Sequence, residues 1–285
     1  MQHFWSQIRT CRANSVMPQS RQPRPAMRLM KLICSSLAFF LTCSLLHSEL
    51  TPQVHVVIDA GHGGKAPSGS TAERSLSSPN NARSPSGVLE KDLTLELALL
   101  VEQALEKDIA SDGNARVRAI LTRRNDTNLD FAERAEVAAS LRPAPVAVIS
   151  LHFNALNGRE KGTVAMVGAR PANANYARDA AFARELTEEV SDVVRNYVPG
   201  SEARPTIDDG HLHGGKGSNF FYQMARHPSL DFVPKCFLEV EFIDTNEAEE
   251  KLLARKSDAF KEIAEAIARV IVRQADTLDG APSDR

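Results

Sequence analysis

Hydrophobic positions after residue 50 form short continuous runs that alternate with longer stretches of helical spacing. The short runs predict buried strands at 54–59, 116–122, 146–151, 162–167 and 236–240. The helical spacings predict helices at 91–107, 130–141, 175–197 and 246–278, the last in two pieces. Such alternation is typical of an α/β domain. We therefore predict a single domain over 49–285, with a mainly parallel central sheet flanked by helices on both faces.

Two polar stretches interrupt this pattern. Residues 65–87 are rich in Ser, Pro, Asn and Ala, and residues 199–218 contain five glycines together with His211 and His213. Loops of this length in a compact domain are usually functional or disordered. Both stretches are therefore candidates for controlling access to a site.

The N-terminal segment has the pattern of a targeting signal. Arg28 and Lys31 precede an apolar run, 32–46, that is shorter than the ~20 residues of a comfortable membrane span. We predict a signal peptide at 27–48 that exports the domain across the inner membrane to the periplasm or cell envelope. An uncleaved anchor is the alternative, and either would be the chain's one link to a membrane. Residues 1–26 are polar and basic, as in a disordered segment or a misassigned start.

Charge and cysteine content narrow the function classes. The first 48 residues carry six basic residues and no acidic one, which leaves 28 basic against 36 acidic residues in the remainder. Phosphate backbones bind clustered Lys and Arg, and no such cluster follows residue 50, so nucleic acid is not an expected partner. Cys236 is the one cysteine after residue 50, which excludes a disulfide within the domain. It lies in an apolar run, as a small buried hydrophobe does.

Four polar side chains lie at the ends of predicted elements. The strand 54–59 continues into a glycine-rich turn that contains His62, and the strand 146–151 continues into His152. Glu239 follows the start of the last strand, and Glu90 stands at the beginning of a helix. Open α/β sheets place ligands at the carboxyl ends of their strands, so we expect these side chains to converge.

Two histidines and a carboxylate are the ligands of many catalytic zinc sites, which keep one position for water. Zinc lowers the pKa of that water to about 7 and makes it a nucleophile, and Glu239 would serve as general base and acid. Each residue also has a plainer explanation. The histidines could be loop residues, Glu90 could favour a helix N-terminus, and Glu239 could be a buried ion-pair partner. The turn could cradle phosphate, although the usual glycine spacings for that are missing.

Five segments together resemble a known family. They are VVIDAGHGG, LEKDLTLELA, LTRRNDTNLDFAERAEVA, VISLHFNA and FLEVEFIDTNEAE, and they span roughly residues 54–275. In this order they resemble the zinc-dependent N-acetylmuramoyl-L-alanine amidases of the Amidase_3 type. The resemblance implies a phosphorylase/hydrolase-like fold and one Zn²⁺ held by His62, Glu90 and His152, with Glu239 as catalytic residue. It also implies peptidoglycan as substrate, cut at the amide between the lactyl group of N-acetylmuramic acid and L-Ala.

Other features of the resemblance concern residues around the site. Glu241 replaces a usually small residue and shares a strand face with Glu239, so it could contact substrate, raise the pKa of Glu239 or pair with a base. Asn154 is a second candidate for substrate binding. Arg134 matches a recurrent arginine, and we expect it to brace the loop before the His152 strand.

Some family members carry an inserted helix that plugs the site until a partner protein withdraws it. Residues 199–217 leave room for such a gate and are the expected contact of an activator protein. His211 and His213 would then be an extra metal ligand or plug, or else solvated loop residues.

Two other functions stay open from the sequence. One is a zinc amidohydrolase or peptidase that acts on a different substrate. The other is a weakly active cell-wall binding protein that uses the same cleft. The complete set of two histidines and two glutamates argues against a pure binding module, which has no need of all four.

Overall fold

The computed structural model describes residues 53–65, 77–107, 116–170 and 173–279, all of them within the compact unit Thr51–Arg285. The predicted signal peptide at 27–48 and the segment 1–26 lie outside the described residues, so both remain predictions.

The centre of the domain is a six-stranded sheet. Its strands are β1 (Gln53–Ala60), β2 (Arg116–Leu121), β3 (Ala147–Asn154), β4 (Val164–Val167), β5 (Ile207–Asp208) and β6 (Lys235–Phe242). They are ordered β2-β1-β3-β6-β4-β5. The first four strands in this order run parallel, whereas β4 pairs antiparallel with β6 and carries β5 parallel at its outer edge. The predicted mainly parallel sheet is confirmed.

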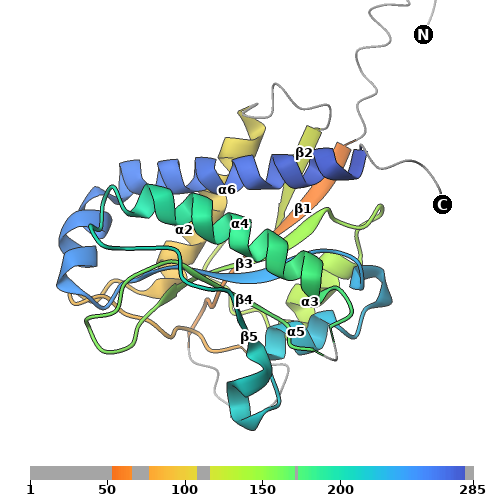
Figure 1. The fold of residues 1–285 in the computed structure, drawn as a ribbon, viewed down its shortest axis with the longest axis horizontal. Coiled ribbons are helices and arrows are strands. Elements are labelled where there is room, and N and C mark those ends of the chain that lie inside the picture. Colours follow the sequence, from red (N-terminus) through yellow and green to blue (C-terminus); the bar gives the residue numbers. More distant parts are fainter. Residues whose placement is uncertain (1–52, 66–76, 108–115, 171–172, 280–285) are drawn as a thin grey trace, which may run out of the picture. The chain divides into compact units, whose positions relative to one another are not determined.

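Three long helices cover one face of the sheet (Figure 1). They are α2 (Glu90–Glu106), α4 (Tyr176–Val194) and α6 (Lys256–Asp279). Leu93, Leu97 and Val101 of α2 pack in one buried cluster with Ile58 of β1 and Ile149 of β3. The three leucine and valine residues recur at helical spacing on one side of α2. Successive side chains of a strand point to opposite faces of the sheet, so the neighbours of Ile58 and Ile149 face away from the three long helices.

Two shorter helices, α3 (Phe131–Ala139) and α5 (Asn219–Met224), cover the other face. Asp130 caps the N-terminus of α3 in a capping box: its carboxylate accepts from the Glu133 backbone N–H, and the Glu133 carboxylate accepts from the Asp130 backbone N–H. Phe220 of α5 packs in the cluster with Val57 and Val148. Ser150 and His152 follow Val148 at alternate positions of β3, so polar strand residues continue the same face beyond this apolar cluster.

Several short elements were not expected from the sequence. The loop at 199–218 contains β5 and the 3-10 helix η2 (Asp209–Gly214), and a second 3-10 helix, η3 (Pro228–Leu230), follows α5. The predicted terminal helix at 246–278 is divided, as expected: the π-helix η4 (Ala248–Leu252) and the 3-10 turn η5 (Leu253–Arg255) precede α6.

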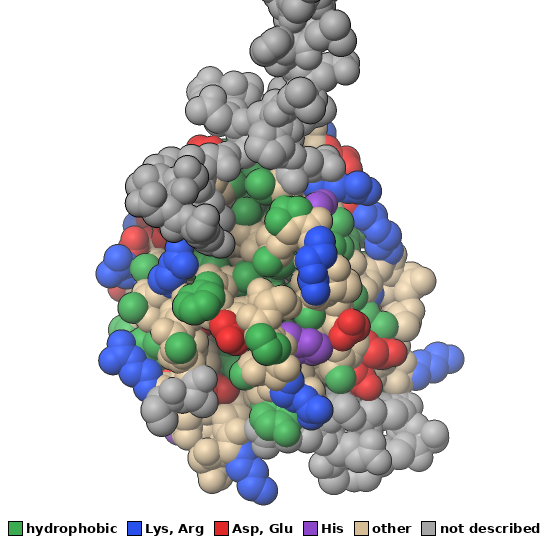
Figure 2. Space-filling view, turned by 90° about the vertical axis from the view of Figure 1, so that its right-hand side faces the viewer, with side chains coloured by type: hydrophobic (Ala, Val, Ile, Leu, Met, Phe, Trp, Pro, Cys, Tyr) green, Lys and Arg blue, Asp and Glu red, His purple; other side chains and the backbone are tan. Residues whose placement is uncertain are grey.

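Figure 2 shows one face on which basic side chains are scattered among acidic and apolar ones rather than gathered together. Within the described part of the chain, no helix is both long enough and apolar enough to cross a membrane.

Candidate metal centre

His62 lies in the turn that follows β1. It adopts a left-handed backbone conformation, with φ of 60°, between glycines that allow the chain to reverse. A Cβ atom on Gly61 would lie 2.2 Å from the His152 ring, so only glycine lets the turn approach this closely. The Nδ1 atom of His62 is 2.8 Å from the carbonyl oxygen of Ser78. That carbonyl can only accept, so Nδ1 carries the proton and Nε2 presents a lone pair.

Glu90 is the first residue of α2 and is almost fully buried. One carboxylate oxygen, Oε2, accepts from the backbone N–H of Ala82 at 2.8 Å, and Oε1 accepts from that of Phe153 at 3.1 Å. Negative charge is favoured at a helix N-terminus. The loop before α2 and the strand β3 thus fix the carboxylate in one orientation.

His152 is buried near the end of β3, and its ring stacks on Phe237 of β6 with centroids 3.7 Å apart. Burial lowers the pKa of His152 to about 4, so the ring is neutral at pH 7. Its Nε2 atom lies 3.1 Å from Ser150 Oγ, and Ser150 Oγ in turn donates to the Asp59 carboxylate at 2.6 Å. Because the serine proton goes to Asp59, His152 Nε2 must donate to the serine, which leaves Nδ1 unprotonated.

The three side chains converge on one point. His62 Nε2 is 3.1 Å from Glu90 Oε1 and 3.1 Å from His152 Nδ1, and His152 Nδ1 is 2.9 Å from Glu90 Oε1. Among the described residues, this is the group of three that could hold a metal ion. Three lone pairs facing one another repel unless a cation lies between them. Ligands of a tetrahedral zinc with bonds of 2.0–2.1 Å are about 3.3 Å apart, so this donor set fits zinc.

Asp59 links this group to a buried ion pair. Its Oδ1 atom accepts from Arg134 Nη1 and from Thr122 Oγ1, each at 2.6 Å. Burial alone would raise the pKa of Asp59, but the Arg134 guanidinium and the hydrogen bonds from Ser150 and Thr122 hold it below its ordinary value. Asp59 is therefore ionised and holds Ser150 in place behind His152.

Arg134 has a different target from the one expected. Its guanidinium donates to the carbonyl oxygens of Ala60 and His62, at 2.9 and 2.8 Å. It is structural, as predicted, but it braces the turn after β1 and not the loop before β3. The reason is that α3, although it precedes β3 in the chain, lies across the end of β1.

Sequence reasoning overlooked a second arginine at this turn. Arg123, just beyond β2, is buried and donates to the carbonyl oxygens of Ala60, Gly61 and Lys91 at 2.7–2.9 Å. Burial, together with the charge of Arg134, lowers the pKa of Arg123 to about 10. Asp59, Ser150 and Arg123 were not singled out, although a strand-face argument could have found Ser150, two residues before His152.

Glu239 is the register partner of His152 on the neighbouring strand β6. Its side chain is partly exposed, but its Oε2 atom is buried and has no hydrogen-bond partner among the described residues. Burial and the nearby charge of Glu90 raise the pKa of Glu239 well above its ordinary value. The structure therefore puts a carboxyl group with an unused oxygen beside the three converging side chains.

Glu241 and Asn154 were the two predicted substrate contacts. Glu241 is fully buried, and its carboxylate accepts from the Gly162 and Phe242 backbones and from Ser201 Oγ. The like charge that acts on Glu239 is that of Glu90 rather than Glu241. Asn154 is half-buried, with its Oδ1 bound to the Ala155 backbone, and its contact with substrate stays a prediction.

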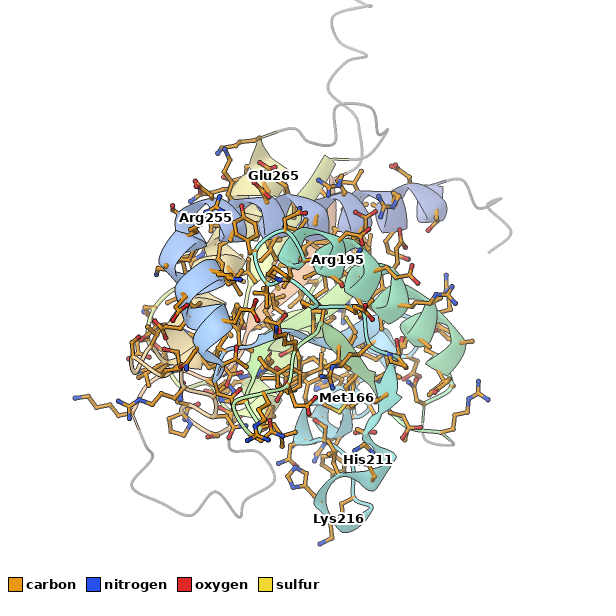
Figure 3. All side chains as sticks on the ribbon, turned by 60° about the vertical axis from the view of Figure 1, so that its left-hand side comes forward. Met166, Arg195, His211, Lys216, Arg255 and Glu265 are labelled. Carbon is orange, nitrogen blue, oxygen red and sulfur yellow. The ribbon has the colours of Figure 1, made fainter. Side chains whose placement is uncertain are left out.

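His211 and His213 lie in the segment that follows β5. Both side chains are exposed, and neither belongs to the group that could hold a metal ion. Figure 3 shows His211 and Lys216 at the tip of this segment, which projects from the domain. Its base is fastened by Asp209, which accepts from the Ala169 backbone at 2.7 Å and the Ser218 backbone at 2.5 Å.

Comparison with known proteins identifies the family. The model of the N-acetylmuramoyl-L-alanine amidase family, Amidase_3, matches residues 56–273. The probable N-acetylmuramoyl-L-alanine amidase AmiB of Haemophilus influenzae is 30% identical over 239 residues, which are 75% of this chain and 50% of that protein. The chain thus spans about half the length of this curated relative.

Solved structures share the fold. The amidase AmiC2 of Nostoc punctiforme superposes with a TM-score of 0.52 at 24% identity, over 78% of this chain and 97% of that one. The CwlD amidase of Clostridioides difficile, solved with the GerS lipoprotein, gives a TM-score of 0.52 at 19% identity, over 79% and 99%. The arrangement of strands and helices is therefore common to these proteins. With the family model covering most of the domain, the chain belongs to the N-acetylmuramoyl-L-alanine amidase family.

Proposed function

We propose that this chain is a zinc-dependent peptidoglycan hydrolase. It would cut the amide between the lactyl group of N-acetylmuramic acid and the L-Ala of the stem peptide. The observation that carries the proposal is the convergence of two imidazole nitrogens and a carboxylate oxygen within 3.1 Å of one another. Beside them lies Glu239 Oε2, which has no hydrogen-bond partner among the described residues. Membership of the amidase family supports the substrate and the bond.

His62, Glu90 and His152 would hold the zinc ion. The ion, when bound, supplies a Lewis acid that polarises the scissile carbonyl and lowers the pKa of a nearby water to about 7. The hydrogen bonds behind the ligands, to Ser78, Ala82 and Ser150, support this assignment because they fix each ligand's orientation.

Glu239 would move the proton. As general base it accepts a proton from the attacking water, and as general acid it returns the proton to the leaving nitrogen of L-Ala. Its raised pKa favours holding the proton between these two steps. Asn154, at the end of β3, is proposed to hydrogen-bond the substrate beside the cleaved amide.

Export and regulation extend the proposal. We propose that the signal at 27–48 delivers the domain to the periplasm or cell envelope, where peptidoglycan lies. Residues 199–217 would be a gate on which an activator acts; the CwlD amidase of Clostridioides difficile has been solved with a lipoprotein bound. The tip around His211 is exposed and projects from the domain, where a partner could reach it.

Digestion of purified peptidoglycan, with and without a chelator, tests the function. We expect free stem peptides that begin with L-Ala, intact glycan strands, and loss of activity with chelator that zinc restores. Mass spectrometry identifies the cleaved bond. Cut glycan strands, a different cleaved amide, or activity indifferent to chelator would overturn the proposal and favour another hydrolase or a binding protein.

A further inference from the structure

The strand that carries Glu239 is irregular immediately after it. His152 pairs with Glu239, but the next paired position is Asn154 with Phe242. One residue of β3 is thus opposed by two residues of β6, Val240 and Glu241, which is a β-bulge. Bulges next to active sites change the direction of side chains, so this one lies where it can orient Glu239.

The bulge is held by the side chain of Glu241. Oε1 accepts from the backbone N–H groups of Gly162 and Phe242, each at 2.8 Å, and Oε2 accepts from Ser201 Oγ. Burial raises the pKa of Glu241, and the three hydrogen bonds counteract this rise only in part. A fully buried carboxyl group is costly, and here three hydrogen bonds, two of them from backbone N–H groups, offset part of that cost.

Three chain segments meet at this carboxylate: the bulge, the entry to β4, and the start of the loop at 199–217. Thr163 Oγ1 donates to the carbonyl oxygen of Val240 at 2.9 Å. Both bulge residues are therefore hydrogen-bonded to the segment just before β4. Arg204 donates to the Lys161 carbonyl at 2.7 Å and packs over the Phe242 ring at 4.8 Å. The backbone around Glu241 is therefore fixed from several sides.

Glu239 lacks an anchor of this kind on Oε2, which has no hydrogen-bond partner among the described residues. The direction of its carboxyl group thus depends strongly on the β6 backbone. That backbone is held in its bulged form by the neighbour two residues further on.

We propose that Glu241 is a positioning residue that orients the Glu239 carboxyl group by holding the bulge in β6. Glu241 does not contact the substrate, because its carboxylate is buried and occupied by three donors. This inference rests on the proposed function, in which Glu239 is the proton-transferring group.

The test compares Glu241→Ala, Glu241→Gln and Ser201→Ala in the full chain. Gln keeps an oxygen for the two backbone donors and can donate its amide to Ser201 Oγ, so it should rescue. Asp179→Ala is the matched control. Asp179 of α4 is fully buried, and its carboxylate accepts from the backbone N–H of Lys235 at 3.1 Å. Lys235 begins β6, so this contact lies at the end of the strand opposite to the bulge.

We expect Glu241→Ala to lower kcat about 100-fold, the loss that a misplaced catalytic group commonly causes, with KM and zinc affinity unchanged. Ser201→Ala should lower kcat less, and Glu241→Gln should retain a kcat close to the wild-type value. Asp179→Ala should lower the melting temperature yet keep kcat. Wild-type kcat in folded Glu241→Ala, loss of zinc with activity, or an equal kcat loss in Asp179→Ala would overturn the inference. If Glu241→Ala does not fold, an unchanged kcat in Ser201→Ala overturns it.

Crystal structures of the variants give a readout that needs no substrate. Glu241→Gln should keep the bulge and the direction of Glu239, whereas Ser201→Ala and Glu241→Ala should shift both. An unmoved Glu239 in these two structures would refute the inference even if the wild-type protein did not cut peptidoglycan. A wild-type protein inert towards peptidoglycan, with Glu239 displaced in the variants, would instead refute the proposed function alone.

Discussion

Asp59 and Ser150 are register partners on the adjacent strands β1 and β3, and the serine hydroxyl donates to the aspartate carboxylate at 2.6 Å. Each has a second partner that leads away from the pair. Asp59 is bound to Arg134, and Ser150 accepts from His152. The hydrogen bond therefore connects a buried ion pair to the ring that we assign to the metal.

Replacing Ser150 with Ala should weaken zinc binding by about 10- to 100-fold, the usual effect of losing a hydrogen bond behind a histidine ligand. Without the hydroxyl, His152 is free to exchange its tautomer and to rotate. Competition with a chromogenic chelator measures the affinity. Ser191→Ala is the control, since Ser191 Oγ is buried without a hydrogen-bond partner among the described residues. Equal zinc affinity in Ser150→Ala and Ser191→Ala would show that the hydrogen bond from His152 to Ser150 does not support metal binding.

Replacing Arg134 with Met should cost about 3–5 kcal/mol in the free energy of unfolding, because it leaves the Asp59 charge buried and unpaired. Urea denaturation of the metal-free protein measures the loss. Arg273→Met is the comparison, since Arg273 pairs with Glu185 and Glu189 while 44% exposed, and should cost about 1 kcal/mol or less. Similar losses of unfolding free energy in the two variants would show that the buried Asp59–Arg134 pair stabilises the fold no more than an exposed ion pair does.

Glu239→Gln and His62→Ala should separate catalysis from metal binding. The first variant should lose about 1000-fold or more in turnover while it keeps its zinc, because an amide cannot accept the proton. The second should lose zinc as well, because it removes a ligand. Metal analysis after dialysis and peptidoglycan digestion provide the two readouts. A Glu239→Gln protein that keeps its activity would remove Glu239 from the mechanism.

Deleting residues 210–216 should raise activity on isolated cell walls several-fold if the loop gates the site. The deletion keeps Ser201, which holds Glu241, and it joins Asp209 to Gly217 so that the Asp209 contact with Ser218 can form within a short turn. Release of stem peptides is the measurement, with the melting temperature as a check on folding. Unchanged or reduced activity in a folded deletion variant would argue against a gate.

Much of the site was accessible from the sequence because each side chain follows a recognisable element. The apolar runs before His62 and His152 indicate parallel strands, and the carboxyl ends of such strands meet at one edge. Glu90 stands at a helix start whose period is clear from Leu93, Leu97 and Val101. Their convergence follows from topology, and the structure brings these three side chains together.

Other features depend on contacts that no local pattern records. The two residues of β5 are exposed and form a strand only because they pair with β4, so they lack an apolar alternation. Helix α5 has six residues, too few to display a helical period. The bulge after Glu239 is likewise invisible in an apolar and acidic run, and only the pairing with β3 reveals it. The contacts of Arg134 likewise depend on how α3 packs across β1, so the prediction that it braces the loop before β3 was wrong.

The three candidate ligands come from three distant parts of the chain: the turn after β1, the start of α2 and the end of β3. An unfolded chain has no such site, so an ion bound there would bind only the folded state. Thermodynamic linkage then adds about 2.7 kcal/mol to stability when free zinc is 100 times its dissociation constant. A chelator would therefore act as a mild denaturant as well as an inhibitor. The zinc concentration of the compartment would set how long the domain survives there, and not only how fast it works.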